Sequence, residues 1–416
     1  MTASLYIHIP FCKKKCDYCD FFSIGEEARR GTPGDLSDSY IDSLVDEARL
    51  YADFYKISEW RTVYVGGGTP SLLSGGQISH LISGIKKIAR VGAETEITVE
   101  MNPDDVCADF LESCGKAGVN RISVGIQAID DDALRAVNRG SSVKIILRAL
   151  GTLRERWRGR LSVDFIAGLP NHTWRSFRNQ FAVLENFTNI DHVSLYTLTV
   201  EEGTPLWSRI ERGETAFSEE KADRMWLSGR NILEKMGFSQ YEVSNFARKG
   251  FESLHNGAYW GQESYVGVGA GAVGTIYDFA EKSAVRWTNT LSVPDYIAGV
   301  RNQRAECDSA VLCGRGAADG LPLLRREIET LDENTLEFEF LMLGFRKLAG
   351  VASEDFELRF GKSLSERLGA ECADGVFARW RKMRLAAARE SCGGGTIYSL
   401  NRRGILLLNR FLEELM

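Results

Sequence analysis

Through its first 240 residues the chain repeats one structural unit, and this repetition restricts its fold more than its composition does. Each unit has a short apolar segment rich in Val, Ile and Tyr, a turn of Gly or polar residues, and a helical pattern. Such segments are typical of buried parallel strands. The predicted strands are Leu5–Ile9, Thr62–Val65, Glu96–Glu100, Arg121–Gly125, Leu161–Ile166 and His192–Thr197. Because alternating strands and helices form parallel sheets, and six units are too few for a closed eight-stranded barrel, we expect an α/β fold with a partial (β/α)6 barrel.

Two of the connecting helices have recognisable starts. Asn102 offers an N-cap, followed by Pro103 at the first helical position and by two acidic residues. Ser218 opens a second helix, whose apolar face ends just before Gly237.

The pattern changes after residue 240. Residues 241–293 are rich in Gly and aromatic residues. The pattern of residues 294–416 predicts helices followed by a compact tail domain. Predicted elements of this last part are the helices Glu337–Arg346 and Arg403–Leu415 and the strand Thr396–Leu400. We therefore expect the chain to have three parts. They are a partial barrel in residues 1–240, a Gly- and aromatic-rich segment in 241–293, and a helical and small α+β domain in 294–416.

Charge and hydropathy exclude several functional classes. The 416 residues carry 51 Lys and Arg against 57 Asp and Glu, so there is no global basic surface for nucleic acid. Apolar stretches are too short for a transmembrane helix, and the N-terminus lacks the pattern of a secretory signal. Nine cysteines, an odd number with three of them clustered, favour reduced thiols that bind a metal over a disulfide framework. We expect a cytoplasmic location.

The clustered cysteines are Cys12, Cys16 and Cys19. Thiolates suit iron–sulfur clusters, zinc or copper(I). A structural zinc site usually has four ligands, and the next cysteines, Cys107 and Cys114, lack the usual pair spacing. Three thiolates on a [4Fe–4S] cubane would leave one iron open to another ligand. The spacing alone still allows a zinc knuckle or a chance cluster.

The C-x-x-x-C-x-x-C pattern directly after a first strand resembles the radical S-adenosylmethionine (SAM) signature. Further sequence motifs narrow the resemblance to the oxygen-independent coproporphyrinogen III oxidase family, over most of the chain. These motifs are Tyr6–Cys12, Gly66–Pro70, Ser123–Gln127 and Asp164–Pro170. The segments Glu337–Arg346 and Leu400–Leu408 resemble that family's C-terminal domain.

This resemblance implies a set of cofactor contacts. Cys12, Cys16 and Cys19 would hold a [4Fe–4S] cluster whose open iron is chelated by SAM. The SAM-contacting positions would be Tyr6, Tyr18, Gly67, Gly68, Thr69, Glu100, Gln127, Arg139 and Asp164. The glycines would bring bare backbone to the methionine part of SAM, because glycine has no side chain to keep a ligand away. Several of these residues follow predicted strands, at the edge where parallel sheets place active sites.

Each of these positions also has a plain structural explanation. Gly66–Gly68 could be an ordinary tight turn, and Glu100 a helix-capping acid at a strand end. Arg139 could be a solvated surface charge, and Asp164 a buried, hydrogen-bonded acid. Their joint occurrence is what makes the resemblance specific.

Three departures separate the chain from the dehydrogenase branch of this family. Phe21 stands where that branch has a fourth cysteine, and Tyr6 lies almost at the start, without that branch's long preceding segment. The words His255-Asn-Gly-Ala-Tyr259-Trp260 resemble the H-N-x-x-Y-W motif of the HemW family of haem chaperones, which is the closer resemblance. It implies His255 as a candidate axial haem ligand, with the aromatic residues against the porphyrin face.

The resemblance therefore implies a protein that binds haem and delivers it to an acceptor protein, and that carries one [4Fe–4S] cluster and SAM. The alternatives are an oxygen-independent coproporphyrinogen III dehydrogenase or another radical SAM enzyme, for example a methylating one. An electron donor of the flavodoxin or ferredoxin type would serve the cluster. Whether the protein is an enzyme stays open at this stage, and no catalytic residue is assigned.

Overall fold

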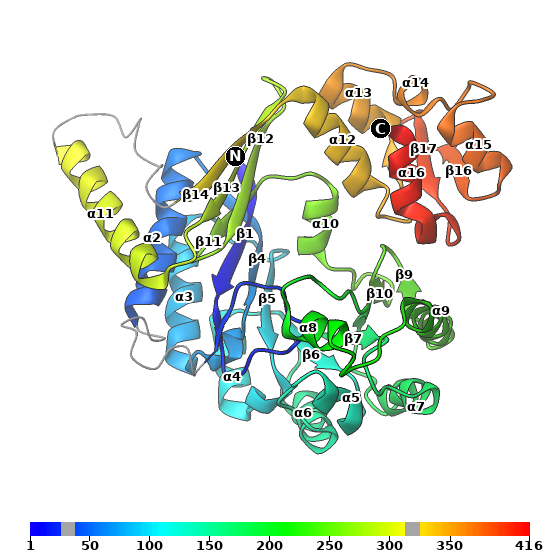
Figure 1. Ribbon diagram of the computed structural model, residues 1–416. Helices are drawn as coiled ribbons and strands as arrows, with labels where there is room; N and C mark the ends of the chain where they lie inside the picture. Colours follow the sequence, from blue (N-terminus) through cyan, green and yellow to red (C-terminus); the bar gives the residue numbers. More distant parts are fainter. Residues whose placement is uncertain (26–37, 313–324) are drawn as a thin grey trace.

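A twelve-stranded sheet forms the centre of the computed structural model, which describes residues 1–25, 38–312 and 325–416 (Figure 1). Six neighbouring strands are parallel: β1 (Thr2–Ile9), β4 (Glu59–Gly67), β5 (Glu96–Met101), β6 (Arg121–Gln127), β7 (Arg160–Ala167) and β8 (His192–Thr197). They contain all six predicted strands, so the partial barrel is confirmed. Apolar residues on both faces of these strands are buried, as is typical of parallel sheets that helices cover.

Helices connect these strands and cover the outside of the sheet (Figure 1). They are α2 (Asp38–Phe54), α3 (Gly75–Ile88), α4 (Ala108–Ala117), α5 (Asp131–Ala136), α6 (Val143–Arg156), α7 (Trp174–Leu184), α8 (Pro205–Glu211) and α9 (Glu219–Lys235). The expected start of α9 is confirmed, because the Ser218 side chain accepts from the Lys221 N–H, and Gly237 follows the helix with φ +85°. The expected start at Asn102 is confirmed in part: Asn102 precedes a helical turn with Pro103 at its first position, but this is the short 3₁₀ turn η2 (Pro103–Asp105), the Asn102 side chain does not cap it, and α4 begins only at Ala108.

The segment after residue 240 adds strands to both edges of the parallel sheet. Strands β9 (Ser239–Gln240) and β10 (Asn245–Ala247) extend the β8 edge in antiparallel pairing. At the other edge β11 (Tyr265–Val268) runs parallel to β1, and β12 (Val273–Asp278), β13 (Ser283–Asn289) and β14 (Arg325–Leu331) continue antiparallel. A Cβ on Gly274 would lie 2.2 Å from the Trp287 ring, so the glycine lets β12 and the indole pack closely.

The short helix α10 (Leu254–Trp260) joins these two edges. The N–H groups of Leu254 and His255 donate to Glu96, which is the first residue of β5, so the helix begins at the amino ends of the parallel strands. The cysteines follow β1 and therefore lie at the opposite, carboxyl ends.

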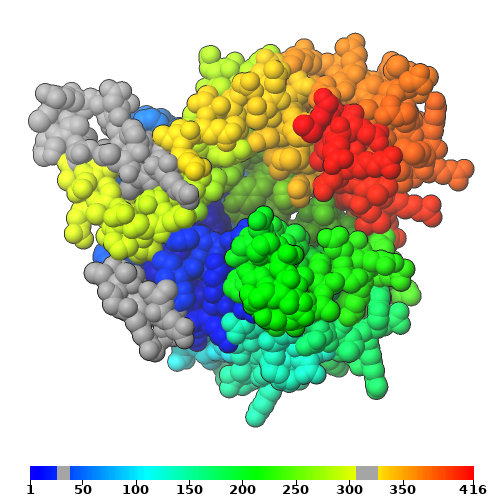
Figure 2. All heavy atoms as spheres, in the orientation of Figure 1, coloured from blue at the N-terminus to red at the C-terminus, as the bar shows by residue number. Residues whose placement is uncertain are grey.

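The C-terminal residues form a second hydrophobic core, around Phe340, Phe356, Phe377, Trp380 and Phe411. Its elements are α12 (Glu333–Gly344), β15 (Val351–Ala352), α13 (Ser353–Phe360), α14 (Leu364–Leu368), α15 (Val376–Lys382), β16 (Ala386–Glu390), β17 (Thr396–Leu400), η4 (Gly404–Leu407) and α16 (Leu408–Leu415). β17 matches the predicted strand. Helix α11 (Val293–Leu312) packs instead beside α2, and the orange and red C-terminal elements gather on one side of the molecule (Figure 2). No helix in the described ranges is long and apolar enough to span a membrane.

Candidate functional site

A cavity of about 430 Å³ lies at the carboxyl ends of the parallel strands. It is lined by all three clustered cysteines and by eight of the nine expected SAM positions: Tyr18, Gly67, Gly68, Thr69, Glu100, Gln127, Arg139 and Asp164. Residues as far apart in the sequence as Cys12 and Asp164 therefore share one site. Tyr6 does not line this cavity, and its hydroxyl lies 2.9 Å from Nδ1 of His8.

The cysteine loop follows β1 and is held by a two-residue parallel pair, β2 (Phe11–Cys12) with β3 (Ile24–Gly25). Cys12 and Cys16 are buried, and Cys19 is half-buried. Within the described residues, no three His, Cys, Asp or Glu side chains converge as ligands of a single metal ion would. Cys12, Cys16 and Cys19 all line the cavity, and three thiolates would suit a [4Fe–4S] cluster with one open iron better than a structural zinc site, which usually has four ligands.

Side chains from two loops contact these sulfur atoms: Thr69 follows β4, and Arg139 follows α5. The Thr69 hydroxyl lies 3.5 Å from Sγ of Cys12, and Nη1 of Arg139 lies 3.5 Å from Sγ of Cys16. A guanidinium beside a thiolate stabilises the negative charge that metal ligation requires. Arg139 is thus part of the cavity wall and not the solvated surface charge considered above.

Asn102 fixes the position of this arginine. Its amide donates to Thr69 Oγ1 at 3.1 Å, and its carbonyl accepts from Nη2 of Arg139 at 2.6 Å. Nε of Arg139 is buried and has no hydrogen-bond partner, which leaves one donor for a ligand in the cavity. The sequence suggested Asn102 only as a helix cap; its link to Thr69 and Arg139 depends on strand order and was missed.

Glu100 is one of the carboxylate residues that line the cavity. Its Oε1 accepts from the Tyr64 hydroxyl at 2.6 Å, and its Oε2 accepts from the Gly67 N–H at 3.2 Å. Burial raises the pKa of Glu100 to about 7, against the lowering effect of these two donors. A carboxyl group with a pKa near neutrality in a cavity can take up or release a proton as a cationic ligand group arrives.

The glycines of the Gly66–Thr69 turn are required by the protein's own packing. Gly67 has φ +108°, and a Cβ there would lie 2.6 Å from the His8 ring. A Cβ on Gly68 would lie 2.7 Å from the carbonyl oxygen of Phe11 and 2.9 Å from that of Ile9. The bare backbone at Gly68 therefore lets the turn pack against the cysteine loop, in addition to leaving room for a ligand.

Two further expected positions shape the cavity floor. Asp164 is half-buried in the cavity wall, where its carboxylate accepts from the Ser123 hydroxyl at 3.2 Å, and desolvation raises its pKa. Gln127 ends β6 with φ +69°, in the left-handed region that non-glycine residues rarely adopt. Such strain is concentrated at ligand sites and marks Gln127 as held by its surroundings.

His255 lies elsewhere: it does not line the cavity of the cysteines. The residue is 2% exposed, with Nδ1 2.7 Å from Thr62 Oγ1 and Nε2 3.0 Å from the Tyr259 hydroxyl. Because the Thr62 hydroxyl donates to Ser4, Nδ1 carries the proton and Nε2 accepts from Tyr259. Burial lowers the pKa of His255 to about 3, so the imidazole is neutral. In this conformation both ring nitrogens are engaged.

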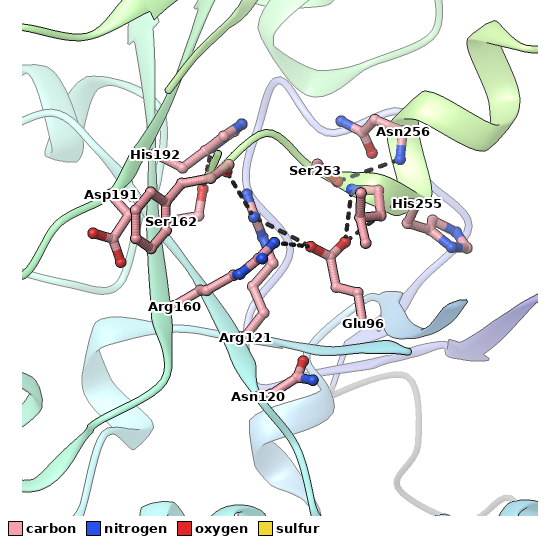
Figure 3. A network of polar contacts seen from close by, with 12 residues as sticks. Glu96, Asn120, Arg121, Arg160, Ser162, Asp191, His192, Ser253, His255 and Asn256 are labelled. Carbon is pink, nitrogen blue, oxygen red and sulfur yellow. Dashed lines mark hydrogen bonds and ion pairs between the residues drawn. The ribbon is translucent and has the colours of Figure 1, made fainter. Parts of the chain in front are cut away.

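Glu96 holds the helix that carries His255. Its Oε1 accepts from the N–H groups of Leu254 and His255 at 3.1 and 3.2 Å, while its Oε2 faces Arg121 and Arg160 at 3.4 and 3.5 Å. Figure 3 shows Glu96 between these arginines and the start of α10, with the His255 imidazole pointing away from the arginines. A carboxylate at the first turn complements the helix dipole, so Glu96 fixes α10 to the amino ends of the strands.

The comparisons with known proteins agree with this architecture. The radical SAM superfamily model matches residues 6–181, and the HemN C-terminal domain model matches residues 331–375. The solved structure of coproporphyrinogen III oxidase (HemN) from Escherichia coli, a radical SAM enzyme, superposes with a TM-score of 0.77. The superposition covers 100% of this chain and 90% of HemN at 20% identity, which shows a shared fold.

Curated relatives cover most of the chain at higher identity. The bovine radical S-adenosyl methionine domain-containing protein 1, mitochondrial, is 34% identical over 85% of this chain and 75% of its own length. Heme chaperone HemW from Lactococcus lactis is 32% identical over 89% of this chain and 88% of its own length. Heme chaperone HemW from Bacillus subtilis is 32% identical over 87% of this chain and 88% of its own length. The radical SAM domain brings a [4Fe–4S] cluster and SAM as cofactors, and the donor set of the cavity fits both. The chain belongs to the HemW family of the radical SAM superfamily.

Proposed function

We propose that this protein is a haem chaperone, which binds haem through His255 and delivers it to an acceptor protein. The observation that carries the proposal is the surroundings of His255 on α10. The imidazole is neutral, which is the form that ligates iron, and it lies against the rings of Tyr64 and Tyr259, at centroid distances of 4.8 Å each. The curated relatives named as heme chaperones support the same assignment.

Haem ligation at His255 requires a change in the conformation of α10. Nε2, the nitrogen without a proton, is occupied by the Tyr259 hydroxyl, and the ring is buried. We propose that the described conformation is the haem-free one and that α10 moves from the amino ends of the strands when haem binds. The apparent haem affinity then contains the cost of opening, because only the open fraction of molecules can bind.

In this proposal the cysteine cavity is a separate cofactor site. Cys12, Cys16 and Cys19 hold the cluster, which together with SAM supplies one-electron chemistry when bound. Arg139 faces the sulfur of Cys16, and Glu100 offers its carboxylate to the ligand's amino group. We further propose a cytoplasmic protein whose cluster is reduced by a donor of the flavodoxin or ferredoxin type.

The experiment that tests the proposal compares delivery with catalysis. The anaerobically reconstituted protein is loaded with haem and mixed with a haem-free apoprotein, and haem transfer is followed by the shift of the Soret band. In parallel, the protein is given coproporphyrinogen III, SAM and a reductant. We expect transfer without formation of protoporphyrinogen IX. Turnover of coproporphyrinogen III at an enzyme-like rate, or failure of the protein to bind haem, would overturn the chaperone assignment.

A further inference from the structure

A second cavity, of about 540 Å³, lies at the amino ends of the strands, at the opposite end of the barrel from the cysteines. We propose that it binds the propionate groups of haem, and this inference rests on the proposed chaperone function. Its wall is formed by the start of β5, the connection from α6 to β7, and the segment that enters α10. The volume falls within the usual range for small-molecule sites.

Three arginines give the cavity its capacity for carboxylates. Arg154, Arg158 and Arg160 all line it. Arg154 donates from Nη1 to the carbonyl of Asn186, and Arg158 donates to the carbonyls of Arg154, Trp157 and Glu155. Each guanidinium has five N–H donors in a fork that matches a carboxylate, so these contacts leave donors for a ligand.

The acidic side chains of the same wall are largely committed to other partners. Glu96 faces Arg121 and Arg160 and caps α10, and Asp191 accepts from the Leu161 N–H at 3.3 Å. Glu94 is exposed at the same wall. Within the described residues the ion pairs of this wall join Glu96 to Arg121 and Arg160, and neither Arg154 nor Arg158 has a carboxylate partner.

The remaining wall suits a flat apolar body. Arg160 lies over the Phe251 ring, with Cζ 5.7 Å from the ring centroid, and Leu254 is 40% exposed although it is a large apolar residue. Asn189, also in the wall, has both amide atoms buried without a hydrogen-bond partner. A ligand with an apolar face and two carboxylates satisfies both the apolar strip and the polar groups.

The position of the cavity connects it with His255. Leu254, in the wall, is the residue before His255, and Glu96, also in the wall, accepts from the N–H groups of both (Figure 3). Haem docked here would lie beside the start of the helix that has to open. The cysteine cavity, at about 430 Å³, is by contrast the site of the cluster and SAM.

The test is a protein–ligand mutant cycle on the full chain. Haem and its dimethyl ester, which lacks both propionate charges, are titrated into wild type and the double variant Arg154→Ala/Arg158→Ala. Arg148→Ala, on the same helix as Arg154 but outside the cavity wall, is the control. We expect the double variant to lose about tenfold in haem affinity, and wild type to bind the ester about tenfold more weakly than haem. The double variant should bind haem and ester alike.

Three results would overturn the inference. The first is unchanged haem affinity in the double variant, and the second is an equal loss for haem and ester, which would report a general change of structure. The third is an equal loss in Arg148→Ala. If wild type binds haem and any one of these three results is found, the proposed propionate site is wrong and the chaperone proposal stands. If wild type binds no haem, both are wrong.

Discussion

The imidazole of His255 stacks on the ring of Tyr64, with centroids 4.8 Å apart and planes inclined by 23°. The hydroxyl of the same tyrosine donates to Glu100 at 2.6 Å. Tyr64 therefore lies between the helix at the amino ends of the strands and the cavity at their carboxyl ends. A movement of α10 would remove one neighbour of this ring, so Tyr64 connects His255 with Glu100 in the cavity wall.

We expect Tyr64→Phe to separate the two contacts of this residue. The variant keeps the ring under His255 and removes the hydrogen bond to Glu100, so SAM affinity should fall about fivefold while haem affinity stays within about twofold. Isothermal titration of SAM and optical titration of haem measure the two effects. Tyr55→Phe, at a ring stacked on Trp287, serves as the control. Wild-type SAM affinity in Tyr64→Phe would show that the hydroxyl has no effect on the cavity.

Haem and SAM should also affect each other's binding in wild type. Because linkage between two sites is reciprocal, haem must change SAM affinity by the same factor by which SAM changes haem affinity. SAM titrations with and without saturating haem measure this factor. Independent binding of the two ligands would mean that Tyr64 does not transmit the movement of α10.

Cys16→Ala should abolish the cluster. Wild type reconstituted without oxygen should contain about four iron and four sulfide per chain, the composition of a [4Fe–4S] cubane. Cys107→Ala changes an exposed cysteine outside the cavity and should keep the full content. Full iron and sulfide in Cys16→Ala, or tight zinc without iron in wild type, would contradict the ligand assignment.

SAM binding should strengthen as pH rises through about 7. In the folded protein burial raises the pKa of Glu100 to about 7, above the value of 4.5 for an exposed glutamate. The buried carboxyl therefore holds its proton between these values, and its contribution to folding stability decreases as pH rises through this window. The ionised carboxylate accepts more strongly from a cationic group than the protonated acid does, so affinity should rise by up to about tenfold from pH 6 to pH 8. Glu100→Gln should remove the slope; a slope that persists in this variant belongs to another group.

Much of this architecture could be predicted from the sequence, because strands and turns have local signals. The six apolar segments, the Gly66–Thr69 turn and the spacing of the cysteines all lie within short windows. Contacts that depend on strand register could not be predicted in this way. The pairing of Tyr64 with Thr98 on β5 brings its hydroxyl to Glu100, two residues further along, and nothing near Tyr64 in the sequence indicates this partner.

The same limit applies to Asn102 and His255. Asn102 before a proline resembles a helix cap in sequence, but strand order places it between Thr69 and Arg139. The motif at residues 255–260 indicated a ligand histidine. The burial of His255 depends instead on the position of α10 at the amino ends of the strands, where the residue hydrogen-bonds with Thr62 and Glu96. Tertiary contacts of this kind are set by residues far apart in the chain.

Loosening α10 should increase haem affinity. Thr62→Val removes the hydrogen bond to Nδ1 of His255, which stabilises the closed conformation, so the open fraction should rise and haem should bind about threefold to tenfold more tightly. Thr98→Val is a matched control, because the buried Thr98 hydroxyl has no hydrogen-bond partner in the described structure. Weaker haem binding in Thr62→Val would show that the described conformation of His255 is the one that binds haem.

The most direct test of the account is a haem titration of wild type and His255→Ala, followed by the Soret band. We predict that wild type binds haem with the spectrum of a histidine-ligated iron. His255→Ala should lose that spectrum and bind more weakly, while retaining some affinity through the apolar face of the porphyrin. If His255→Ala kept both the affinity and the spectrum of wild type, haem ligation by His255, and with it the role given to α10, would be contradicted.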